Sequence, residues 1–299
     1  MPCCRRAVEG TIEGKAADLY EFISLMVQGV RDGDRSAVAL LLSRGNSANK
    51  PIGRPGGTLY PLIFVATQYG HREVVALLLD REALVNAAQS DALATSLMPA
   101  SEGNHLSIVS LLLDYGASVN QSALDGDTAL IVACENGHLT VAQLLVSRGA
   151  VVDQANNHGN TALGQACLDG HVPVIGFMLD SGADVIWQDV AGVSPLMIAS
   201  IKGHTEAVDL LLRRGALVDL PNKNRNTALH GACHHENEVA VCLLQAAGAS
   251  TTLEDNQGHC AMDWATAPRQ GHCAMDWATA PRNAAVRQIL QQHMHAEGQ

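Results

Sequence analysis

The sequence has few aromatic residues, few charges and no long apolar run. Phe, Trp and Tyr make up 3% of its 299 residues and charged residues 16%, while 47% are hydrophobic. The core must therefore be built from Leu, Val, Ile and Ala. No run of about 18 apolar residues is present, which excludes a membrane-spanning helix. The N-terminal residues also lack the basic start and apolar segment of a secretory signal.

The charge balance is acidic. Asp and Glu number 30 against 19 Lys and Arg, which gives a formal net charge of −11. A surface of this sign repels phosphate backbones and anionic lipid headgroups. We therefore expect a protein of the cytoplasm, with the nucleus as the alternative, that neither inserts into membranes nor binds nucleic acid.

The cysteines are spaced as core residues are, and not as metal ligands. Cys134, Cys167 and Cys233 each follow an alanine, and the steps between them are 33 and 66 residues. Zinc sites use much shorter Cys-x-x-Cys or His-x-x-x-His spacings. We expect buried thiols and no metal site. Cys3 and Cys4 lie beside two arginines and are open to lipidation, but no second anchor signal accompanies them.

One layout recurs along nearly the whole chain at a step of 33 residues. In its clearest copy a Gly-Asp turn leads to Thr128, which caps a short helix; a Gly-His pair and a second helix follow. A Gly or Ala stands five residues after each marker threonine or its equivalent. The markers are Ser24, Pro61, Thr95, Thr128, Thr161, Ser194, Thr227 and Cys260.

These units resemble ankyrin repeats, whose signature is Thr-Pro-Leu-His-x-Ala at the same period. Residues 227–232 read Thr-Ala-Leu-His-Gly-Ala and residues 194–199 read Ser-Pro-Leu-Met-Ile-Ala. The resemblance implies an all-α solenoid of about eight helix-turn-helix units with hairpin-like fingers. One unit cannot bury its apolar side alone, so the period must hold from neighbour to neighbour.

We expect an N-terminal capping helix over residues 1–23, a repeat domain over 24–295 and a tail over 296–299. The repeats begin near residues 24, 58, 91, 124, 157, 190, 223 and 256. Residues 257–269 recur unchanged at 270–282. Only one copy fits the first-helix position of the last unit, so we expect the other to form a loop or surface helix. Which copy packs, and whether the duplication is natural, engineered or an assembly error, stays open.

No catalytic, phosphate-binding or dinucleotide motif is present. The Gly-His histidines recur at the repeat spacing, so we expect each to bond backbone across the loop of its own unit. We predict no catalytic residue, no cofactor and no enzyme activity. The resemblance also makes Asn86 and Asn120, near the ends of second helices, candidates for hydroxylation.

The resemblance implies protein recognition through a concave surface of inner-helix ends and fingers. We predict a monomeric, non-catalytic adaptor that binds one or more proteins or peptides. The alternative is a regulatory or targeting subunit of an enzyme complex, acting as inhibitor or substrate adaptor. By register, the candidate contact residues are Tyr69, Glu135, Asn136, Asp169, Ile201, Lys202, His234 and His235 on inner helices, and Asp127, Asn160, Val193 and Asn226 on fingers.

Two parts of this surface carry distinct predictions. Acidic residues of the third to fifth units, including Asp127, Glu135 and Asp169, favour a basic partner. In a later finger, Ile186 and Trp187 replace the Asn-Ala pair that is usual in such fingers. We expect Trp187 to be an apolar interface anchor. The alternative is that its ring packs on the neighbouring finger and staples the stack.

Overall fold

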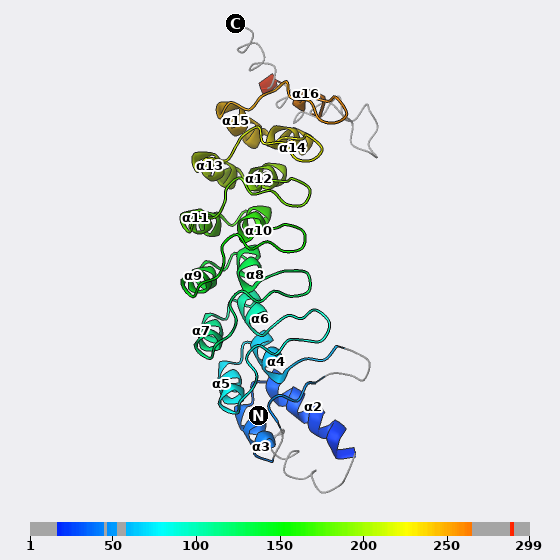
Figure 1. Cartoon of the computed structure of the whole chain (residues 1–299), viewed down its shortest axis with the longest axis vertical. Coiled ribbons are helices and arrows are strands. Elements are labelled where there is room, and N and C mark those ends of the chain that lie inside the picture. Colours follow the sequence, from blue (N-terminus) through cyan, green and yellow to red (C-terminus); the bar gives the residue numbers. More distant parts are fainter. Residues whose placement is uncertain (1–16, 45–46, 53–57, 265–287, 290–299) are drawn as a thin grey trace. The chain divides into compact units, whose positions relative to one another are not determined.

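The computed structural model describes residues 17–44, 47–52, 58–264 and 288–289. Within these residues the helices α2 to α15 come in consecutive pairs, and a loop that forms a finger leads from one pair to the next (Figure 1). The predicted all-α repeat architecture is confirmed. The chain divides into two compact units, Met1–Ala133 with Thr140–Val151 and Cys134–Leu139 with Val152–Gln299, called here the N-terminal and C-terminal units.

The first helix among the described residues of the N-terminal unit is α2, which is longer than the other described helices. It runs from Ala17 to Arg31 and so joins the end of the expected capping segment to the first marker, Ser24. Residues 1–16 lie outside the described residues. The helices that follow are α3 (Arg35–Ser43), α4 (Leu62–Gln68), α5 (Arg72–Asp80), α6 (Leu97–Glu102) and α7 (Leu106–Asp114). Both units contribute residues to α8 (Ala129–Glu135) and α9 (Leu139–Ser147).

The C-terminal unit continues the same pattern. Its helices are α10 (Ala162–Asp169), α11 (Val172–Asp180), α12 (Pro195–Lys202), α13 (Thr205–Arg213), α14 (Ala228–His234), α15 (Glu238–Ala246) and α16 (Ala261–Trp264). α16 begins one residue after the marker Cys260, within the first copy of the duplicated segment. The second copy lies outside the described residues, so the prediction for it stays a prediction.

The sequence dictates where each first helix begins and ends. Thr161 and Ser194 accept a hydrogen bond at their hydroxyl oxygens from Gly164 N and Met197 N, both at 3.3 Å. Such side chains satisfy amide groups that a helix N-terminus leaves without partners. At the other end, the C-cap Gly203 has a φ of 76°, a backbone conformation that glycine adopts without strain.

The core consists of small residues on the first helices and leucines on the second. Ala166, Ala199 and Ala232 are fully buried, which lets α10, α12 and α14 pack closely side by side. Leu211 on α13 and Leu244 on α15 are also fully buried. The core therefore has the aliphatic composition that the scarcity of aromatic residues predicts.

The Gly-His histidines connect consecutive repeats, and the expectation that each serves its own unit is wrong. His204 Nε2 lies 3.1 Å from Leu168 O, and His171 Nε2 lies 2.9 Å from Glu135 O, one repeat earlier in each case. The earlier repeat offers a glycine at this point: a Cβ added to Gly170 would lie 2.6 Å from the His204 ring. Each glycine thus leaves room for the next repeat's histidine, because the ring lies where a Cβ would be.

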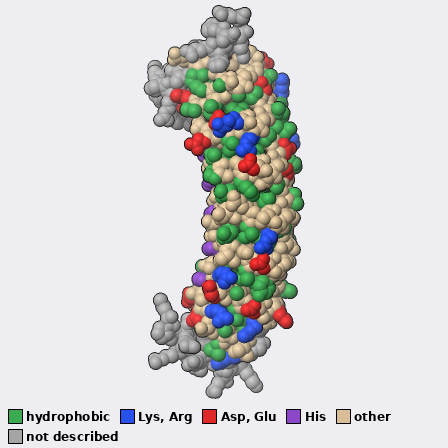
Figure 2. All heavy atoms as spheres, turned by 90° about the vertical axis from the view of Figure 1, so that its left-hand side faces the viewer, with side chains coloured by type: hydrophobic (Ala, Val, Ile, Leu, Met, Phe, Trp, Pro, Cys, Tyr) green, Lys and Arg blue, Asp and Glu red, His purple; other side chains and the backbone are tan. Residues whose placement is uncertain are grey.

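The second helices carry charged side chains of both signs among apolar ones on their outer face (Figure 2). Ion pairs join consecutive second helices, as in Arg148–Asp114 at 2.9 Å within the N-terminal unit and Arg214–Asp180 at 2.7 Å within the C-terminal unit. These groups are largely exposed, so each pair stabilises the fold by less than about 1 kcal/mol. No helix among the described residues combines the length and the apolar composition needed to cross a bilayer.

The fingers are held by backbone and Asx hydrogen bonds. Asn222 Oδ1 accepts from the amides of Asn224 and Asn226, both at 2.9 Å, which closes the turn of that finger. Neighbouring fingers then pair through single backbone bonds, such as Lys223 N to Ala191 O at 3.1 Å. The fingers therefore form an ordered edge, and the side chains at their bases are fixed in position.

Candidate functional site

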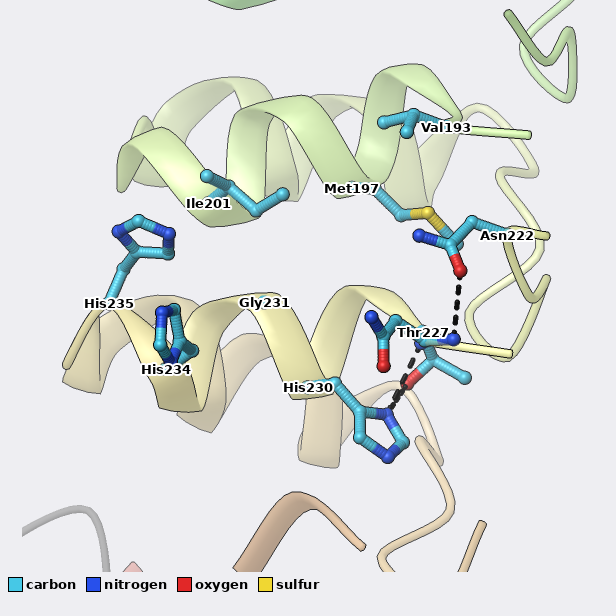
Figure 3. A pocket seen from close by; sticks show the side chains of 10 residues that line it. Val193, Met197, Ile201, Asn222, Thr227, His230, Gly231, His234 and His235 are labelled. Atoms are coloured by element: carbon cyan, nitrogen blue, oxygen red, sulfur yellow. Dashed lines mark hydrogen bonds between the residues drawn. The ribbon is translucent and has the colours of Figure 1, made fainter. Parts of the chain in front are cut away.

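A hollow of about 200 Å³ lies between α12 and α14 in the C-terminal unit, and we call it the α12–α14 hollow (Figure 3). Three apolar side chains, Val193, Met197 and Ile201, project from the α12 side toward α14. The finger of residues 222–226 closes one end, and the C-terminal end of α14 closes the other. Its lining residues are Val193, Met197, Ile201, Asn222, Asn226, Thr227, His230, Gly231, His234 and His235.

The floor of the hollow is formed where Ile201 meets a helix position without a side chain. Gly231 stands four residues after the marker Thr227; the same position holds Gln165 and Ile198 in the two preceding repeats. A Cβ added to Gly231 would lie 2.6 Å from Ile201 Cγ1. Ile201 thus packs directly against the backbone of α14 and takes up the space of a Cβ at residue 231, and both residues line the hollow.

The two ends of the hollow differ in chemistry. At one end His234 and His235 are exposed, with their rings edge to face and 5.0 Å between centroids. At the other end are the finger residues Asn222 and Asn226, both half-buried. Asn226 Oδ1 is buried and lacks a hydrogen-bond partner among the described residues. The site is therefore an apolar floor between a pair of imidazoles and a pair of amides.

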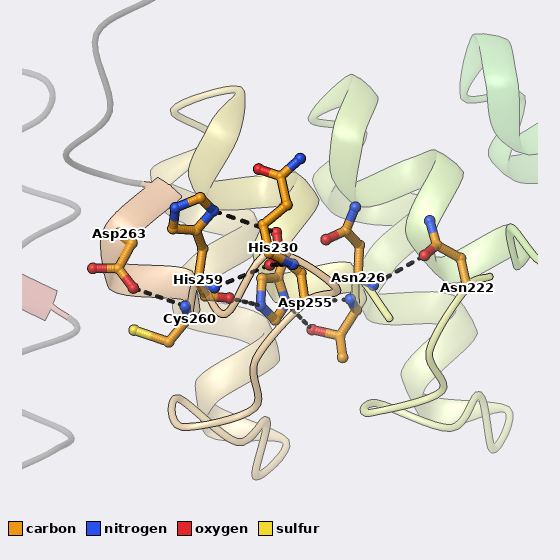
Figure 4. Close-up of polar contacts among 9 residues, drawn as sticks. Asn222, Asn226, His230, Asp255, His259, Cys260 and Asp263 are labelled. Carbon is orange, nitrogen blue, oxygen red and sulfur yellow. Dashed lines mark hydrogen bonds and ion pairs between the residues drawn. The ribbon is translucent and has the colours of Figure 1, made fainter. Parts of the chain in front are cut away.

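The hollow is supported by a buried histidine on the far side of α14. His230 points away from α12 (Figure 3), and its Nδ1 accepts a hydrogen bond from Thr227 N at 3.2 Å. Nδ1 also lies 2.9 Å from Thr227 Oγ1, and Nε2 lies 3.3 Å from His259 O in the following finger (Figure 4). Burial lowers the pKa of His230 below its ordinary value of 6.5. The neutral ring therefore fixes the first turn of α14 and joins it to the next finger.

The next finger repeats the Asx turn with a buried carboxylate. Asp255 Oδ1 accepts from Gln257 N at 2.7 Å and from His259 N at 3.0 Å (Figure 4). Its Oδ2 lies 3.8 Å from His259 Nδ1. At the start of α16, Asp263 accepts from Cys260 N at 2.8 Å, and this bond lowers the pKa of the Asp263 carboxyl. These contacts hold the repeat that follows the hollow.

Five of the thirteen predicted contact residues meet at this hollow: Val193, Ile201, Asn226, His234 and His235. Lys202 is exposed and directly follows Ile201. Equivalent or adjacent positions of earlier repeats in the same unit hold Glu135, Asn136, Asn160 and Asp169. Of the remaining three, Tyr69 and Asp127 belong to the N-terminal unit, and Trp187 belongs to the C-terminal unit. Tyr69 is exposed and stacks beside His71.

Trp187 lies outside the hollow and contacts the preceding finger. Its indole is half-buried, and Nε1 donates a hydrogen bond to Gly159 O at 2.9 Å. This is the geometry that the stapling alternative predicts. The neighbouring Ile186 and Val190 are exposed, by 41% and 56%. A role for Trp187 as an interface anchor stays a prediction, and the bond to Gly159 speaks against it.

Sequence reasoning missed five of the ten lining residues: Met197, Asn222, Thr227, His230 and Gly231. A signal for Gly231 was present, because the repeat alignment shows the one glycine at a position that holds a larger side chain in the neighbouring repeats. Met197 reads as a core residue and is only 2% exposed, so the alignment alone does not separate it from the core. Asn222 reads as a turn residue, and that is also what it is.

The described residues contain no group of three or more His, Cys, Asp or Glu side chains arranged to hold a metal ion. The prediction of buried thiols is confirmed, since Cys134, Cys167 and Cys233 are at most 1% exposed. Burial raises the pKa of Cys134 and Cys233 to about 12 and also raises that of Cys167. These thiols stay protonated near neutral pH and are therefore poor nucleophiles.

Comparisons with known proteins agree with the repeat architecture. A family model described as ankyrin repeats (3 copies) matches residues 25–123, 97–189 and 186–255, which together span more than half of the chain. A search of curated proteins gives no match. Among solved structures, the human ASB11 ankyrin repeat domain is similar, with a TM-score of 0.66 and 24% identity over 77% of this chain and 96% of that one. At this identity the likeness concerns the fold alone.

Proposed function

The chain belongs to the ankyrin-repeat family, and from this premise we propose that it binds a partner protein at the α12–α14 hollow. Ankyrin repeats generally mediate protein–protein interactions, and the fold is typically a non-catalytic interaction module. We propose a monomer of the cytoplasm or nucleus that acts as an adaptor. The finer assignment, a regulatory or targeting subunit of an enzyme complex, is the second candidate.

The observation that carries this proposal is the open apolar floor at Gly231. Val193 and Ile201 are half-buried and line the hollow, and Ile201 packs on the α14 backbone at Gly231. Binding sites on proteins are concave and mostly apolar, with a few polar groups that fix orientation. The amides of Asn222 and Asn226 and the imidazoles of His234 and His235 supply such groups at the two ends.

A Leu introduced at position 231 tests the site because it displaces Ile201 and changes the lining of the hollow. We expect Gly231→Leu to lose a partner that the unaltered chain captures from a cell lysate. The matched control is Gln165→Leu, which places the same side chain at the equivalent position two repeats earlier, away from the hollow. Both variants are first compared by circular dichroism and thermal melting to verify the fold.

The pattern of capture decides between the candidates. Loss with Gly231→Leu and retention with Gln165→Leu supports the hollow as the contact site. Equal capture by all three chains contradicts it and moves the site to the predicted residues of earlier repeats, such as Asp169. A captured enzyme in stoichiometric amount, with altered activity when bound, favours the regulatory subunit over the adaptor.

A further inference from the structure

We propose that the α12–α14 hollow accepts one apolar side chain from an acidic peptide segment of the partner. This inference rests on the proposed function and adds the chemistry of the occupant. It differs from the basic partner that the acidic residues of the third to fifth units predict. The reason is the distribution of cations in the C-terminal unit.

The described part of the C-terminal unit contains five Lys and Arg residues. Arg213 pairs with Asp209 at 2.7 Å, and Arg214 pairs with Asp180, both on second helices. The other three, Lys202, Lys223 and Arg225, are exposed and form none of the ion pairs found among the described residues.

These three cations are adjacent in sequence to residues that line the hollow. Lys202 follows Ile201, and Lys223 and Arg225 lie in the finger between the lining residues Asn222 and Asn226. A segment that crosses the hollow from the finger to the helix ends therefore passes an exposed cationic residue at each end. Charge complementarity of this kind selects an acidic partner and accelerates encounter.

Two acidic residues, Asp189 and Glu236, lie close in sequence to the lining residues of the hollow. Asp189 Oδ1 accepts hydrogen bonds from Ala191 N and Val193 N, at 2.8 and 2.7 Å. Glu236 is half-buried where the chain leaves α14. Asp169 occupies the position equivalent to Lys202 one repeat earlier, so the change from acidic to basic falls between α10 and α12.

The size of the hollow limits the central residue to one side chain. A dry cavity of about 150 Å³ binds benzene, so an open hollow of about 200 Å³ accommodates a Leu, Met or Phe side chain. The unpartnered Asn226 Oδ1 fits the same occupant. Rotation of this amide would let its oxygen accept a hydrogen bond from a peptide N–H and remove the cost of a buried acceptor without a donor.

The test is selection of random 12-residue peptides displayed on phage against the full chain. Enriched peptides are synthesised with a fluorescent label and their affinities measured by fluorescence polarisation. We expect a Leu, Met or Phe flanked on both sides by Asp or Glu. Replacing that apolar residue by Ala should weaken binding by about tenfold, as for removal of a buried anchor.

Charge reversal provides variants that leave the core untouched. We expect Lys202→Glu combined with Lys223→Glu to weaken binding of the enriched peptide by at least about fivefold, with a smaller difference at high salt. The matched control is Arg213→Glu, which changes the net charge in the same direction on an exposed second-helix site. That variant should bind the peptide within about twofold of the unaltered chain.

Failure of the inference and failure of the proposed function give different results. Basic or uncharged peptides whose binding is lost with Gly231→Leu overturn the acidic occupant and leave the contact site in place. Peptides that bind Gly231→Leu as well as the unaltered chain contradict the site itself. A library that yields no peptide dependent on Gly231 overturns both proposals.

Discussion

At the scale of single residues, adding a side chain at Gly231 has two opposing effects on stability, one from helix propensity and one from steric contact. Alanine favours a helix over glycine by up to about 1 kcal/mol. A Cβ at this position, however, would lie 2.6 Å from Ile201 Cγ1. Overpacking of this kind costs about 1–3 kcal/mol, so the steric effect outweighs the propensity.

We therefore expect Gly231→Ala to lower the free energy of unfolding by about 1 kcal/mol, measured by urea denaturation. Ile201→Ala removes the side chain that clashes. In the double variant the propensity gain should reappear, so the two changes should be non-additive by more than about 0.5 kcal/mol. Strict additivity would contradict a direct contact between residues 201 and 231.

A pH dependence follows from the neutral His230. Its pKa is lowered by burial, a shift that the neighbouring His259 carbonyl and the Asp255 and Asp219 carboxylates partly oppose. The unfolded chain therefore binds a proton more readily than the folded one. The stability from this group is present above the ordinary pKa of 6.5 and is lost as the pH falls through that value toward the lower folded pKa.

We expect the free energy of unfolding to decrease between about pH 7.5 and about pH 5.5, and to decrease less in His230→Asn. An asparagine does not titrate, and its amide oxygen can replace Nδ1 as the acceptor for Thr227 N. The comparison of the two chains cancels the contributions of the other histidines. An identical pH dependence in both would show that His230 has no shifted pKa.

At the scale of elements, the joint between repeats is a side chain that bonds the preceding first helix. His204 does this at Leu168 O, and Asn237 does it one repeat later with bonds from Nδ2 to Ser200 O at 2.7 Å and Ile201 O at 2.9 Å. The joint therefore needs a side chain that donates a hydrogen bond to the preceding first helix, and an amide can do this as well as an imidazole.

His204→Ala should lower the free energy of unfolding by about 1–2 kcal/mol, because a partly buried carbonyl loses its donor. We expect His204→Asn to lose less than His204→Ala, in line with the natural Asn237. The control is His234→Ala at an exposed position, with an expected change within about 0.5 kcal/mol. Equal losses in both His204 variants would contradict the joint as described.

The finger joint at Trp187 separates stapling from anchoring. Trp187→Phe keeps an aromatic ring and removes the donor to Gly159 O. We expect a loss of about 1 kcal/mol in thermal or urea unfolding, with capture of the partner unchanged. Unchanged stability together with lost capture would favour the interface anchor.

The repeat layout was predictable from the sequence because it depends on local chemistry. Thr161 and Ser194 each precede an apolar segment and cap the helix that it forms. The buried alanines of the first helices recur at a step of 33 residues. The hydrogen-bond partners of side chains that reach into another repeat were harder to predict. The bond from His204 to Leu168 joins residues 36 apart and depends on how the repeats stack.

Register alone predicted that Ile201, His234 and Asn226 share a surface but did not show that they meet at one hollow. That result depends on how Ile201 packs against the backbone of α14 at Gly231, which is a property of packing. The indole of Trp187 illustrates the same limit. An apolar finger residue suggests an anchor until the carbonyl that accepts its N–H is known.

At the scale of the whole molecule, each repeat depends chiefly on its neighbours, since solenoid stability is a sum of repeat and interface contributions. Leu211 on α13 is fully buried, and Leu211→Ala should cost about 2–5 kcal/mol. We expect amide hydrogen exchange to accelerate in α12 to α15 and to change little in α3 to α5. The control, Leu217→Ala, removes a side chain that is 52% exposed. A uniform acceleration along the chain would show global cooperativity instead.

The glycine at position 231 also has a consequence for how such a chain acquires new specificity. Ile201 can pack onto the backbone of α14 because residue 231 has no side chain, and the lining of the hollow changes with that one position. A small residue in place of Ile198 would change the packing one repeat earlier and require no new fold. Divergent members of a repeat array can therefore shift their preference for a partner through one small residue, while the inherited framework stays intact.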